Sequence, residues 1–578
     1  MKSLKSLNHY FFKYKWLLIL GILFVSLSTI FGTYQAVIVR KGTNIILKMI
    51  EDKNYSDSGA FLSYGLIIIG LALTSGLFMF LMRQTIIVMS RHIEYDQKNE
   101  IYAHYQKLDI TFYKQHSTGD LMNRITEDVG KVRMYTGPAV MYMANTFVTI
   151  VTVLIFMLNV NWQLTLVVFI PLPFLSILIY KVSDLINKRS NKVQQELSNL
   201  TSHAQESFAS IRVIKAYARE KFFSETLDAK GDIYKKENLK LATIESYFQP
   251  LMALMIGMSV LFTVWYGGHL VTAKKIEAGN IPEFIMNVYR LTWPFASLGW
   301  VTSLIQRASA SQERINEFLD TKPDINNTEM APTETSGTIE FKNVSFTYPE
   351  TGITALDEVS FTLKKGEMLG ITGPVGSGKS TIAQLISRIY DATAGEIILN
   401  GKNIKDHNLH HLRKNIGVVP QEVFLFSDTI SNNISFSANN SFTHKDIEDA
   451  ARNAAVYDNI IGFPEKFDTM VGERGITLSG GQKQRVSIAR AIIKNPDMLV
   501  FDDCLSAVDT ETESFILNNL KQIMKNKTCI IISPRVSSIK GADKILILDG
   551  GKIIESGSHD ELLKLKGKYF NLYELQKN

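Results

Sequence analysis

The hydrophobic pattern of the chain divides it into two halves. Long apolar segments recur through roughly the first 305 residues, whereas the rest of the chain has only short ones. Six of the long segments have about 20 residues each, the length that an α-helix needs to cross the hydrocarbon core of a bilayer. One such segment could be a buried helix of a soluble protein, but six in one half indicate a membrane domain. They are Trp16–Val39, Phe61–Met82, Pro138–Leu158, Trp162–Tyr180, Pro250–Val271 and Ile281–Leu304.

The connections between these segments differ in length and in charge. Asn159–Asn161 is a tight hairpin, whereas Arg83–Gly137 and Lys181–Gln249 are long, polar and helix-periodic. We expect the two long connections to be helices that leave the membrane and return. They and the N-terminal tail are rich in Lys and Arg, so the positive-inside rule puts all three in the cytoplasm. Six spans then return the C-terminal half to the cytoplasm as well.

The N-terminal tail and the region after the last span set the domain limits. Met1–Lys15 is basic and runs into a first span that is longer than a signal-peptide core, so we expect an uncleaved membrane helix. Residues 320–336 lack apolar periodicity and indicate a linker. After Gly337, short β-rich runs alternate with helical ones, which is typical of an α/β domain with a largely parallel sheet. We predict a transmembrane domain over 1–319, a linker over 320–336 and an α/β domain over 337–578.

Charge and cysteine content narrow the possible partners. The 578-residue chain has a formal net charge of +6, and its basic residues gather beside apolar spans. This distribution does not indicate a nucleic-acid partner. The two cysteines, Cys504 and Cys529, exclude a disulfide framework and fit a reducing compartment.

A glycine-rich loop is the clearest chemical motif. Its pattern G-x-x-x-x-G-K-S follows the apolar strand Met368–Thr372 and precedes a helical run, which is the context that a phosphate-binding P-loop requires. Backbone N–H groups of such a loop, together with the helix N-terminus, bind phosphates. We expect Lys379 to reach the β- and γ-phosphates and Ser380 to bind Mg²⁺. The predicted nucleotide-binding residues of the loop are Gly373, Pro374, Val375, Gly376, Ser377, Gly378, Lys379, Ser380 and Thr381.

Two further motifs follow the P-loop along the chain. Met498–Phe501 is a buried-strand pattern that ends in Asp502, whose carboxylate would hold Mg²⁺ through water. Upstream of it lies Leu478–Gln482, with the sequence L-S-G-G-Q. Taken alone this pentapeptide could be an ordinary helix start, but its position between the P-loop and Asp502 gives it a different meaning.

With these motifs in this order, the chain resembles the ATP-binding cassette exporters whose membrane and nucleotide-binding domains share one polypeptide. The resemblance covers essentially all 578 residues. It implies a six-span α-helical membrane domain of the type IV exporter fold and an α/β P-loop nucleotide-binding domain. It also implies ATP and Mg²⁺ as cofactors, the lipid bilayer as surroundings and a second half-transporter as partner. In this family two nucleotide-binding domains enclose two ATP molecules, and each site combines the P-loop of one chain with the signature motif of the other.

The resemblance implies roles for single residues. Tyr348 matches the aromatic residue that stacks on adenine, and Gln421 matches the Q-loop residue that links Mg²⁺ to the membrane domain. Glu473 lies in the loop that precedes the signature in exporters, and Asp509 of the sequence S-A-V-D matches the D-loop. The signature residues, which would contact the partner's ATP, are Leu478, Ser479, Gly480, Gly481 and Gln482.

The two long excursions also match the family. In the family their tips are short coupling helices that dock into the nucleotide-binding domains, and rigid helices carry the motion to the membrane. The matching residues of the first excursion are Phe112, Gly119, Asp120, Arg124 and Asp128, and those of the second are Glu206, Ile211, Arg212, Lys215 and Glu220.

Two positions depart from the family pattern. The family has glutamate after the Asp502 position to orient the attacking water, and this chain has Asp503. The carboxylate oxygen of Asp503 should lie roughly 1–1.5 Å short of the place that a glutamate oxygen would reach, and misplacement on that scale can cost ~10²-fold in rate. The family has an H-loop histidine where this chain has Pro534, which offers neither a side-chain donor nor a backbone N–H.

The departures allow several interpretations. Each could be a single tolerated substitution, or Asp503 could support slow hydrolysis in a homodimer. The favoured interpretation is that this chain supplies the degenerate ATP site of a heterodimer, while its intact signature completes the partner's site. A further alternative is a regulatory or channel-like subunit that is gated by ATP binding without hydrolysis.

Clues to the substrate come from the sixth span. Arg290 lies there, and an ionisable residue at membrane depth marks a cavity or pathway by default. The alternative is that Arg290 snorkels or packs near the helix end. Trp293, Phe295 and Trp300 could line a pocket for amphipathic molecules, or they could pack against helices or face lipid. We predict ATP-driven export or flipping of a small amphipathic drug or lipid across the cell membrane by a dimer.

The orientation generates a prediction. Single cysteines introduced into Lys107–Arg133 or Ser190–Arg219 should not react, in intact cells, with a membrane-impermeant thiol reagent added outside. A cysteine at position 274, in place of Lys274, should react because it lies in an external connection. Labelling of the two ranges without labelling at position 274 would reverse the orientation.

Overall fold

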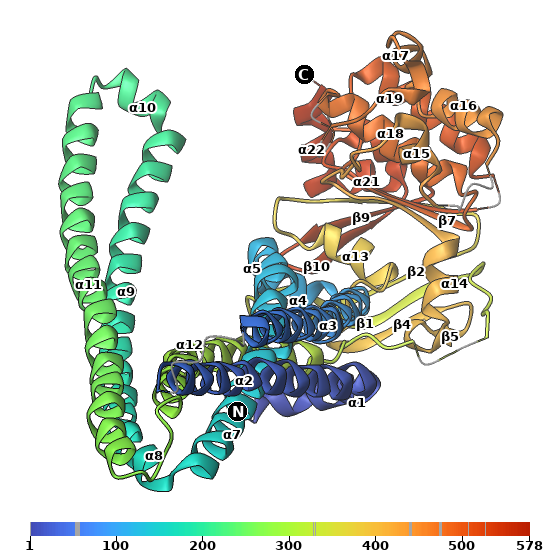
Figure 1. Ribbon diagram of the computed structural model, residues 1–578. Helices are drawn as coiled ribbons and strands as arrows, with labels where there is room; N and C mark the ends of the chain where they lie inside the picture. The colour runs from blue at the N-terminus through green and yellow to red at the C-terminus, as the bar shows by residue number, and fades with distance from the viewer. Residues whose placement is uncertain are drawn as a thin grey trace. The chain divides into compact units, whose positions relative to one another are not determined.

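The protein is described by a computed structural model that covers residues 2–51, 58–327, 329, 331–437, 442–472, 475, 477–506, 508–525 and 527–577 (Figure 1). Its internal contacts separate two compact units. The helical unit comprises Met1–Gln106 and Thr118–Thr321, and the α/β unit comprises Lys107–Ser117 and Lys322–Asn578. The α/β unit therefore includes a short piece of the first long excursion.

Helices form all six predicted spans of the helical unit. By length and composition alone, four stretches among the described residues are suited to cross a membrane: Lys15–Glu51, Phe61–Tyr105, Thr118–Val160 and Glu220–Thr272. Of the other two predicted spans, the fourth is formed by α8 and the start of α9, which are separated only at Ile170. The sixth lies in α12. The helices of this unit are η1 (Ser3–Leu7), α1 (Asn8–Lys13), α2 (Lys15–Glu51), α3 (Ser58–Tyr105), α5 (Thr118–Asn123), η2 (Arg124–Asp128), α6 (Val129–Met134), η3 (Tyr135–Ala139), α7 (Val140–Val160), α8 (Trp162–Phe169), α9 (Pro171–Ala209), α10 (Ile211–Ala216), α11 (Glu220–Thr272) and α12 (Asn280–Asp320).

Long helices continue well beyond the predicted spans. α3 has 48 residues and α11 has 53, so neither helix ends where its apolar segment ends. α9 and α11 lie side by side and are joined at their tip by the short helix α10 (Figure 1). Both long excursions are helical, as the scarcity of Gly and Pro in them predicts.

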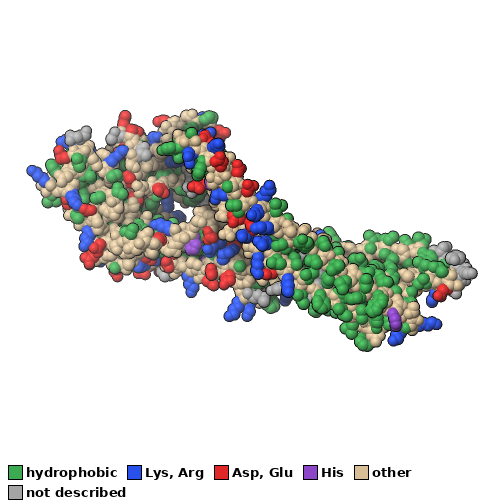
Figure 2. Space-filling model, turned by 90° about the vertical axis from the view of Figure 1, so that its left-hand side faces the viewer, with side chains coloured by type: hydrophobic (Ala, Val, Ile, Leu, Met, Phe, Trp, Pro, Cys, Tyr) green, Lys and Arg blue, Asp and Glu red, His purple; other side chains and the backbone are tan. Residues whose placement is uncertain are grey.

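The surface of the helical unit is apolar over a wide area. Leu73 and Phe147 are each 70 % exposed, and many other large apolar side chains of α2, α3, α7 and α11 also face outward. Figure 2 shows a broad region of hydrophobic side chains with few charged ones, next to a zone where Lys and Arg are frequent. An exposed apolar surface this extensive would be unstable in water and is suited to lipid.

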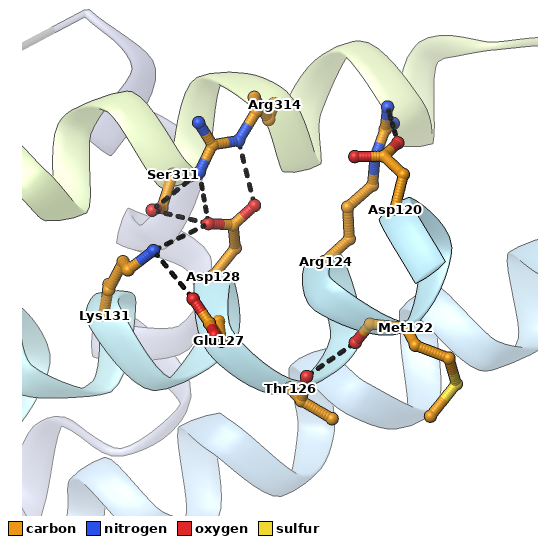
Figure 3. A network of polar contacts seen from close by, with 9 residues as sticks. All are labelled: Asp120, Met122, Arg124, Thr126, Glu127, Asp128, Lys131, Ser311 and Arg314. Atoms are coloured by element: carbon orange, nitrogen blue, oxygen red, sulfur yellow. Dashed lines mark hydrogen bonds and ion pairs between the residues drawn. The ribbon is translucent and has the colours of Figure 1, made fainter. Parts of the chain in front are cut away.

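One buried carboxylate connects two helical segments (Figure 3). Asp128, at the end of η2, is only 3 % exposed. Arg314 of α12 binds it with two donors: Nε donates to Oδ2 at 3.0 Å and Nη2 donates to Oδ1. Ser311 Oγ adds a 2.8 Å hydrogen bond to Oδ1, and Lys131 Nζ lies 3.7 Å from the same oxygen. The charge of Asp128 is therefore compensated by donors on its own segment and on α12.

The segment around Asp128 departs from regular α-helix. η2 and η3 are π-helical turns, and Pro138 lies inside η3. Proline removes a backbone donor from the helical ladder, and a π-turn is one way for a helix to accommodate this. At Gly137 a side chain would collide with Ser90 of α3, because a β-carbon there would lie 2.6 Å from the Ser90 Oγ. The irregular backbone thus allows close packing between α3 and η3.

The α/β unit contains two sheets. One has six strands in the order β10-β9-β3-β8-β7-β6, in which β9, β3, β8, β7 and β6 are parallel and β10 is antiparallel to β9. The other is antiparallel, in the order β2-β1-β4-β5. The predicted largely parallel α/β sheet is thereby confirmed. The strands are β1 (Ile339–Thr347), β2 (Thr354–Leu363), β3 (Met368–Thr372), β4 (Ala394–Leu399), β5 (Lys402–Asn403), β6 (Ile416–Val419), β7 (Met498–Asp502), β8 (Thr528–Ile532), β9 (Lys544–Asp549) and β10 (Lys552–Gly557).

Helices of the α/β unit pack around the parallel sheet and leave its central strands without exposed residues. Every residue of β7 and of β8 is buried, as expected for strands that are covered on both faces. The helices are α4 (Ile110–Gln115), α13 (Lys379–Ile386), η4 (Ile404–Asp406), α14 (Leu409–Asn415), α15 (Ile430–Ser435), α16 (His444–Asn453), α17 (Tyr457–Ile461), η5 (Lys466–Asp468), α18 (Gly480–Ile493), α19 (Thr510–Ile523), α20 (Val536–Ile539), α21 (His559–Leu565) and α22 (Lys568–Lys577).

Hydrogen bonds hold two outlying segments in this unit. The backbone N–H of Asp324 donates to the Asp109 carboxylate at 2.7 Å, and the same carboxylate caps α4 by accepting from Phe112 N at 3.3 Å. Asn327 Oδ1 accepts from the backbone N–H of Leu409 at 2.8 Å. The described residues of the 320–336 region are therefore extended but tethered to the α/β unit.

The Asp128 network generates the second prediction. Asp128→Asn keeps the size of the side chain but removes the charge that binds Arg314 through two donors. We expect a loss of about 1.5–3 kcal/mol in stability, the usual range for hydrogen bonds to charged groups. The matched control is Asp120→Asn, because Asp120 pairs with Arg124 at 2.9 Å while remaining 48 % exposed. That change should cost less than about 1 kcal/mol. Thermal unfolding of the purified variants tests this, and equal shifts for both would contradict it.

Candidate nucleotide site

The carboxyl ends of four neighbouring parallel strands form one edge of the six-stranded sheet. The strands β3, β8, β7 and β6 are adjacent in this order. The P-loop follows β3, Pro534 follows β8, Asp502 ends β7 and Gln421 follows β6. Ligands of open α/β sheets bind at such an edge. Residues that lie up to about 160 positions apart in the chain therefore meet at one site.

A cavity of about 520 Å³ lies at this edge. Every predicted P-loop residue except Pro374 lines it. Tyr348, Gln421, Asp502, Asp503 and Pro534 line it as well. The structure thus brings together the predicted aromatic, phosphate-binding, metal-binding and degenerate positions.

The P-loop has the backbone shape that its glycines permit. Gly373 and Gly378 have φ of +151° and +93°, and a β-carbon at either position would lie 2.1 Å from a backbone carbonyl oxygen, that of Leu548 or Ala355. Lys379 Nζ donates to the carbonyls of Gly373 and Pro374, at 2.9 and 2.6 Å. The ammonium group therefore lies inside the curve of the loop, where a phosphate would meet it.

Side chains at the start of α13 connect the P-loop to the other walls. Ser380 Oγ donates to Asp502 Oδ1 at 2.9 Å. The hydroxyls of Thr381 and Tyr348 lie 3.0 Å apart, and the Tyr348 hydroxyl also donates to Gln384 Oε1 at 3.1 Å. These contacts hold the Tyr348 ring and the Ser380–Asp502 pair at the cavity.

Asp503 is held in an unusual backbone conformation. Its φ is +46°, which is rare for a residue with a side chain, and its backbone N–H donates to Ile532 O at 2.8 Å. The side-chain Oδ1 is buried and has no hydrogen-bond partner among the described residues. Pro534, which lines the same cavity, has no donor to offer it.

Burial at the cavity disfavours the charged forms of three ionisable groups. Burial raises the pKa of the Asp502 carboxyl, and the neighbouring Asp503 charge raises it further. Burial likewise raises the pKa of Asp503 and lowers the pKa of Lys379. The charged forms of these groups lack the solvation that they would have in water, so the site is suited to bind counter-charges.

The signature lies elsewhere in the α/β unit. Ser479 caps α18 by accepting from Gln482 N at 3.3 Å, and Gln482 Oε1 accepts from Ser479 N at 2.9 Å. None of the described signature residues, Leu478 to Gln482, lines the 520 Å³ cavity, and neither does Asp509. Glu473, and Ala507 of the D-loop motif, lie outside the described residues.

Arg535 ties the segment after β8 to the D-loop. Its guanidinium donates to the carbonyls of Ser506 and Val508, at 2.8 and 3.2 Å, and to Glu513 Oε2 at 3.2 Å. Glu513 is only 1 % exposed and also accepts from Ser538. A movement of the segment that contains Pro534 would therefore be passed to the D-loop.

Two charged residues of the cavity have no counterpart in the sequence motifs. Lys114 of α4 and Glu350 both line it, beside Tyr348. Lys114 is far from the other cavity residues in the chain and belongs to no recognisable motif. No sequence signal placed it there, because its position depends on the packing of α4 in the α/β unit.

The sixth-span residues lie in and beside the helical core. The Arg290 guanidinium approaches Gly32 of α2 so closely that a β-carbon at Gly32 would be 2.7 Å from Nη1. Phe295 packs against the core, whereas Trp293 and Trp300 are exposed by half or nearly half. Both tryptophan rings contact Tyr142 of α7.

Comparisons with known families match both units. The ABC transporter transmembrane region matches residues 18–295, and the ABC transporter family matches residues 356–506. The chain is 35 % identical, over 98 % of its length and 95 % of that protein, to the multidrug resistance-like ATP-binding protein MdlA of Escherichia coli K12. It is 33 % identical, over 93 % of both chains, to the ATP-dependent lipid A-core flippase of Photobacterium profundum.

A solved structure extends the similarity to the fold. The structure of a bacterial Atm1-family ABC exporter with ATP bound is 25 % identical in sequence and superposes with a TM-score of 0.80. The match covers 99 % of both chains.

Proposed function

Since the chain belongs to the ATP-binding cassette exporters with fused membrane and ATPase domains, we propose that it exports or flips a small amphipathic substrate, a drug or a lipid, across the cell membrane. The observation that carries the proposal is the convergence of the P-loop, Tyr348 and Asp502 on one cavity. Two relatives support the substrate class, one by its multidrug resistance-like name and one as a lipid flippase. The apolar outer surface of the helical unit supports a membrane location.

The cavity residues divide into groups that bind nucleotide and groups that handle its metal. The Tyr348 ring stacks on adenine, while the P-loop N–H groups and Lys379 bind the phosphates. Ser380 and Asp502 fit Mg²⁺, because a hydroxyl and a carboxylate already 2.9 Å apart are oxygen ligands of the kind that this ion takes. Gln421, on the same wall, is the third residue that we assign to the metal and to hydrolysis. Mg²⁺ would neutralise charge that develops on the phosphates.

The partner is a second half-transporter that places its signature over this cavity. The described cavity lacks a signature motif of its own, and Ser479–Gln482 of this chain starts a 14-residue helix whose N-terminus favours phosphate. The tip of the α9–α11 hairpin supports the same arrangement. Its apolar side chains are exposed although we expect the tip in the cytoplasm, so a partner domain would cover them. They are Phe208, Ile211, Val213, Tyr217 and Phe222.

Within the dimer this chain supplies the degenerate site. Asp503 is one methylene short, its Oδ1 has no described partner, and Pro534 has no donor with which to orient water. ATP binding would close the two cassettes and turn the substrate pathway outward, and hydrolysis at the partner's site would reset it. Both termini lie in the cytoplasm. Arg290 and the aromatic residues of α12 are the candidates for substrate contact.

Transport activity is the third prediction. Inverted membrane vesicles from the protein's own cells should take up a fluorescent amphipathic dye or flip a labelled phospholipid when ATP is added. Lys379→Ala should abolish this uptake, since the ammonium group at the centre of the P-loop is lost. A matched control is Lys365→Ala, a surface lysine of the same unit outside the cavity lining. ATP-independent movement of both probes, unchanged by Lys379→Ala, would contradict an ATP-driven exporter.

The division of labour is the fourth prediction. Asp503→Asn should change the steady-state ATPase rate less than about twofold, because the site that contains Asp503 contributes little to the ATP hydrolysis of the assembly. Ser479→Arg should remove most of the activity, because it puts bulk and positive charge against the partner's γ-phosphate and blocks closure. The assembly is purified from its own cells through a tag on this chain, so that any natural partner is retained.

A slow homodimer gives the opposite pattern. There both substitutions affect the same two identical sites, so both should be severe, and only this chain should be recovered. Equal damage from Asp503→Asn and Ser479→Arg would overturn the asymmetric assignment and make Asp503 the working carboxylate. An ATPase rate that never responds to substrate, together with ATP-gated flux, would favour a channel-like subunit.

A further inference from the structure

We propose that Lys114, on α4, competes with adenine for the face of Tyr348, so that α4 senses whether the nucleotide base is bound. The inference rests on the proposed role of Tyr348 as the adenine platform. It concerns a residue of the first long excursion that no motif of the nucleotide site contains.

The geometry places the ammonium group of Lys114 at the platform. Its Nζ lies 4.8 Å from the centroid of the Tyr348 ring and 5.1 Å from that of Tyr390. The Tyr390 ring meets the Tyr348 ring edge-on, at 5.6 Å and 88°, so the two rings form a corner that holds the cation. Lys114 and Tyr348 line the same cavity as the P-loop. The cation and the ring therefore both border the space in which the nucleotide would lie.

A stacked base and this cation cannot share the ring face. A base stacks at a carbon–carbon distance of about 3.5 Å. With Nζ at 4.8 Å from the ring centroid, too little room remains for an atom of the base between them. Adenine that stacks over the part of the Tyr348 ring next to Nζ would displace the Lys114 ammonium group.

The displaced ammonium group has an acceptor within reach. Glu350 Oε1 lies 3.9 Å from Lys114 Nζ and accepts a 2.9 Å hydrogen bond from the Tyr390 hydroxyl. A small rotation of the lysine side chain would exchange the ring contact for a closer ion pair with this carboxylate. The exchange keeps Lys114 paired in both states, so the competition is modest in size.

The position of α4 in the chain gives the competition a consequence. α4 packs within the α/β unit, where its cap Asp109 binds the backbone of Asp324. In the chain it lies between α3 and α5, both of which belong to the helical unit. A change in the contacts of Lys114 therefore acts on the link between nucleotide binding and the membrane helices.

The fifth prediction tests the competition at this chain's own site. The assembly is purified from its own cells and photolabelled with 8-azido-ATP. Labelling of this chain, measured as a separate band on a gel, is competed with either ATP or inorganic tripolyphosphate. In Lys114→Met, ATP should bind about two- to fivefold more tightly, the effect of removing one exposed cation–π contact. Affinity for tripolyphosphate, which has no base, should not change. Lys114→Arg keeps the cation, so its affinity for ATP should equal that of the wild type or be lower.

Matched controls separate the possible failures. Lys107→Met removes the same charge from an exposed position of the same segment and should alter neither affinity. In a Tyr348→Leu background, Lys114→Met should have no further effect, because the contested ring is gone. If Tyr348→Leu alone leaves ATP affinity unchanged, the proposed adenine platform fails. If that affinity falls but Lys114→Met weakens ATP binding, weakens both ligands or changes nothing, the competition itself is refuted.

Discussion

Parallel register across β3, β8, β7 and β6 is the constraint on which the nucleotide site depends. Parallel strands end on the same edge of a sheet, so the order of the strands decides which loops meet there. Along the chain β8 comes last of the four, yet in the sheet it lies between β3 and β7. Pro534 therefore follows the strand between the one that carries the P-loop and the one that ends in Asp502. Pro534 lines the cavity between these two strands and brings no side-chain donor to it.

The sequence predicted those parts of the site whose geometry is local. A strand, a glycine loop and a helix follow one another directly in the P-loop, so their motif specifies their shape. Asp502 was predictable in the same way, because it ends a buried strand. By contrast, Lys114 meets Tyr348 only through the packing of α4, and Arg314 meets Asp128 across 186 positions of the chain. Contacts of this kind depend on tertiary structure, which hydrophobic periodicity does not encode.

The helical unit shows the same division between what is local and what is not. Apolar segments located six helical segments, because a bilayer selects for about 20 apolar residues in a row. They could not locate the helix ends, because the edge of a membrane is a change of solvent and does not by itself interrupt a helical backbone. The helix α11 continues even through Pro250. α3 and α11 therefore continue as single helices into polar sequence. The π-helical turns were also unpredicted, and one of them, η3, lies where Pro138 and the close approach of Gly137 to Ser90 distort the ladder.

Burial of like-charged and oppositely charged groups at one edge of the sheet favours the binding of counter-charges there. Asp502 and Asp503 have raised pKa values and Lys379 a lowered one, all chiefly because they are buried. Lys379 turns to the carbonyls of its own loop, and Asp503 Oδ1 has no described partner. Phosphates and a divalent cation would supply the charges that these groups lack. A second chain's helix N-terminus over the cavity would remove more water and strengthen each of these interactions. Under the proposed asymmetry, a site that binds ATP strongly but orients water poorly would keep the dimer closed while the other site hydrolyses.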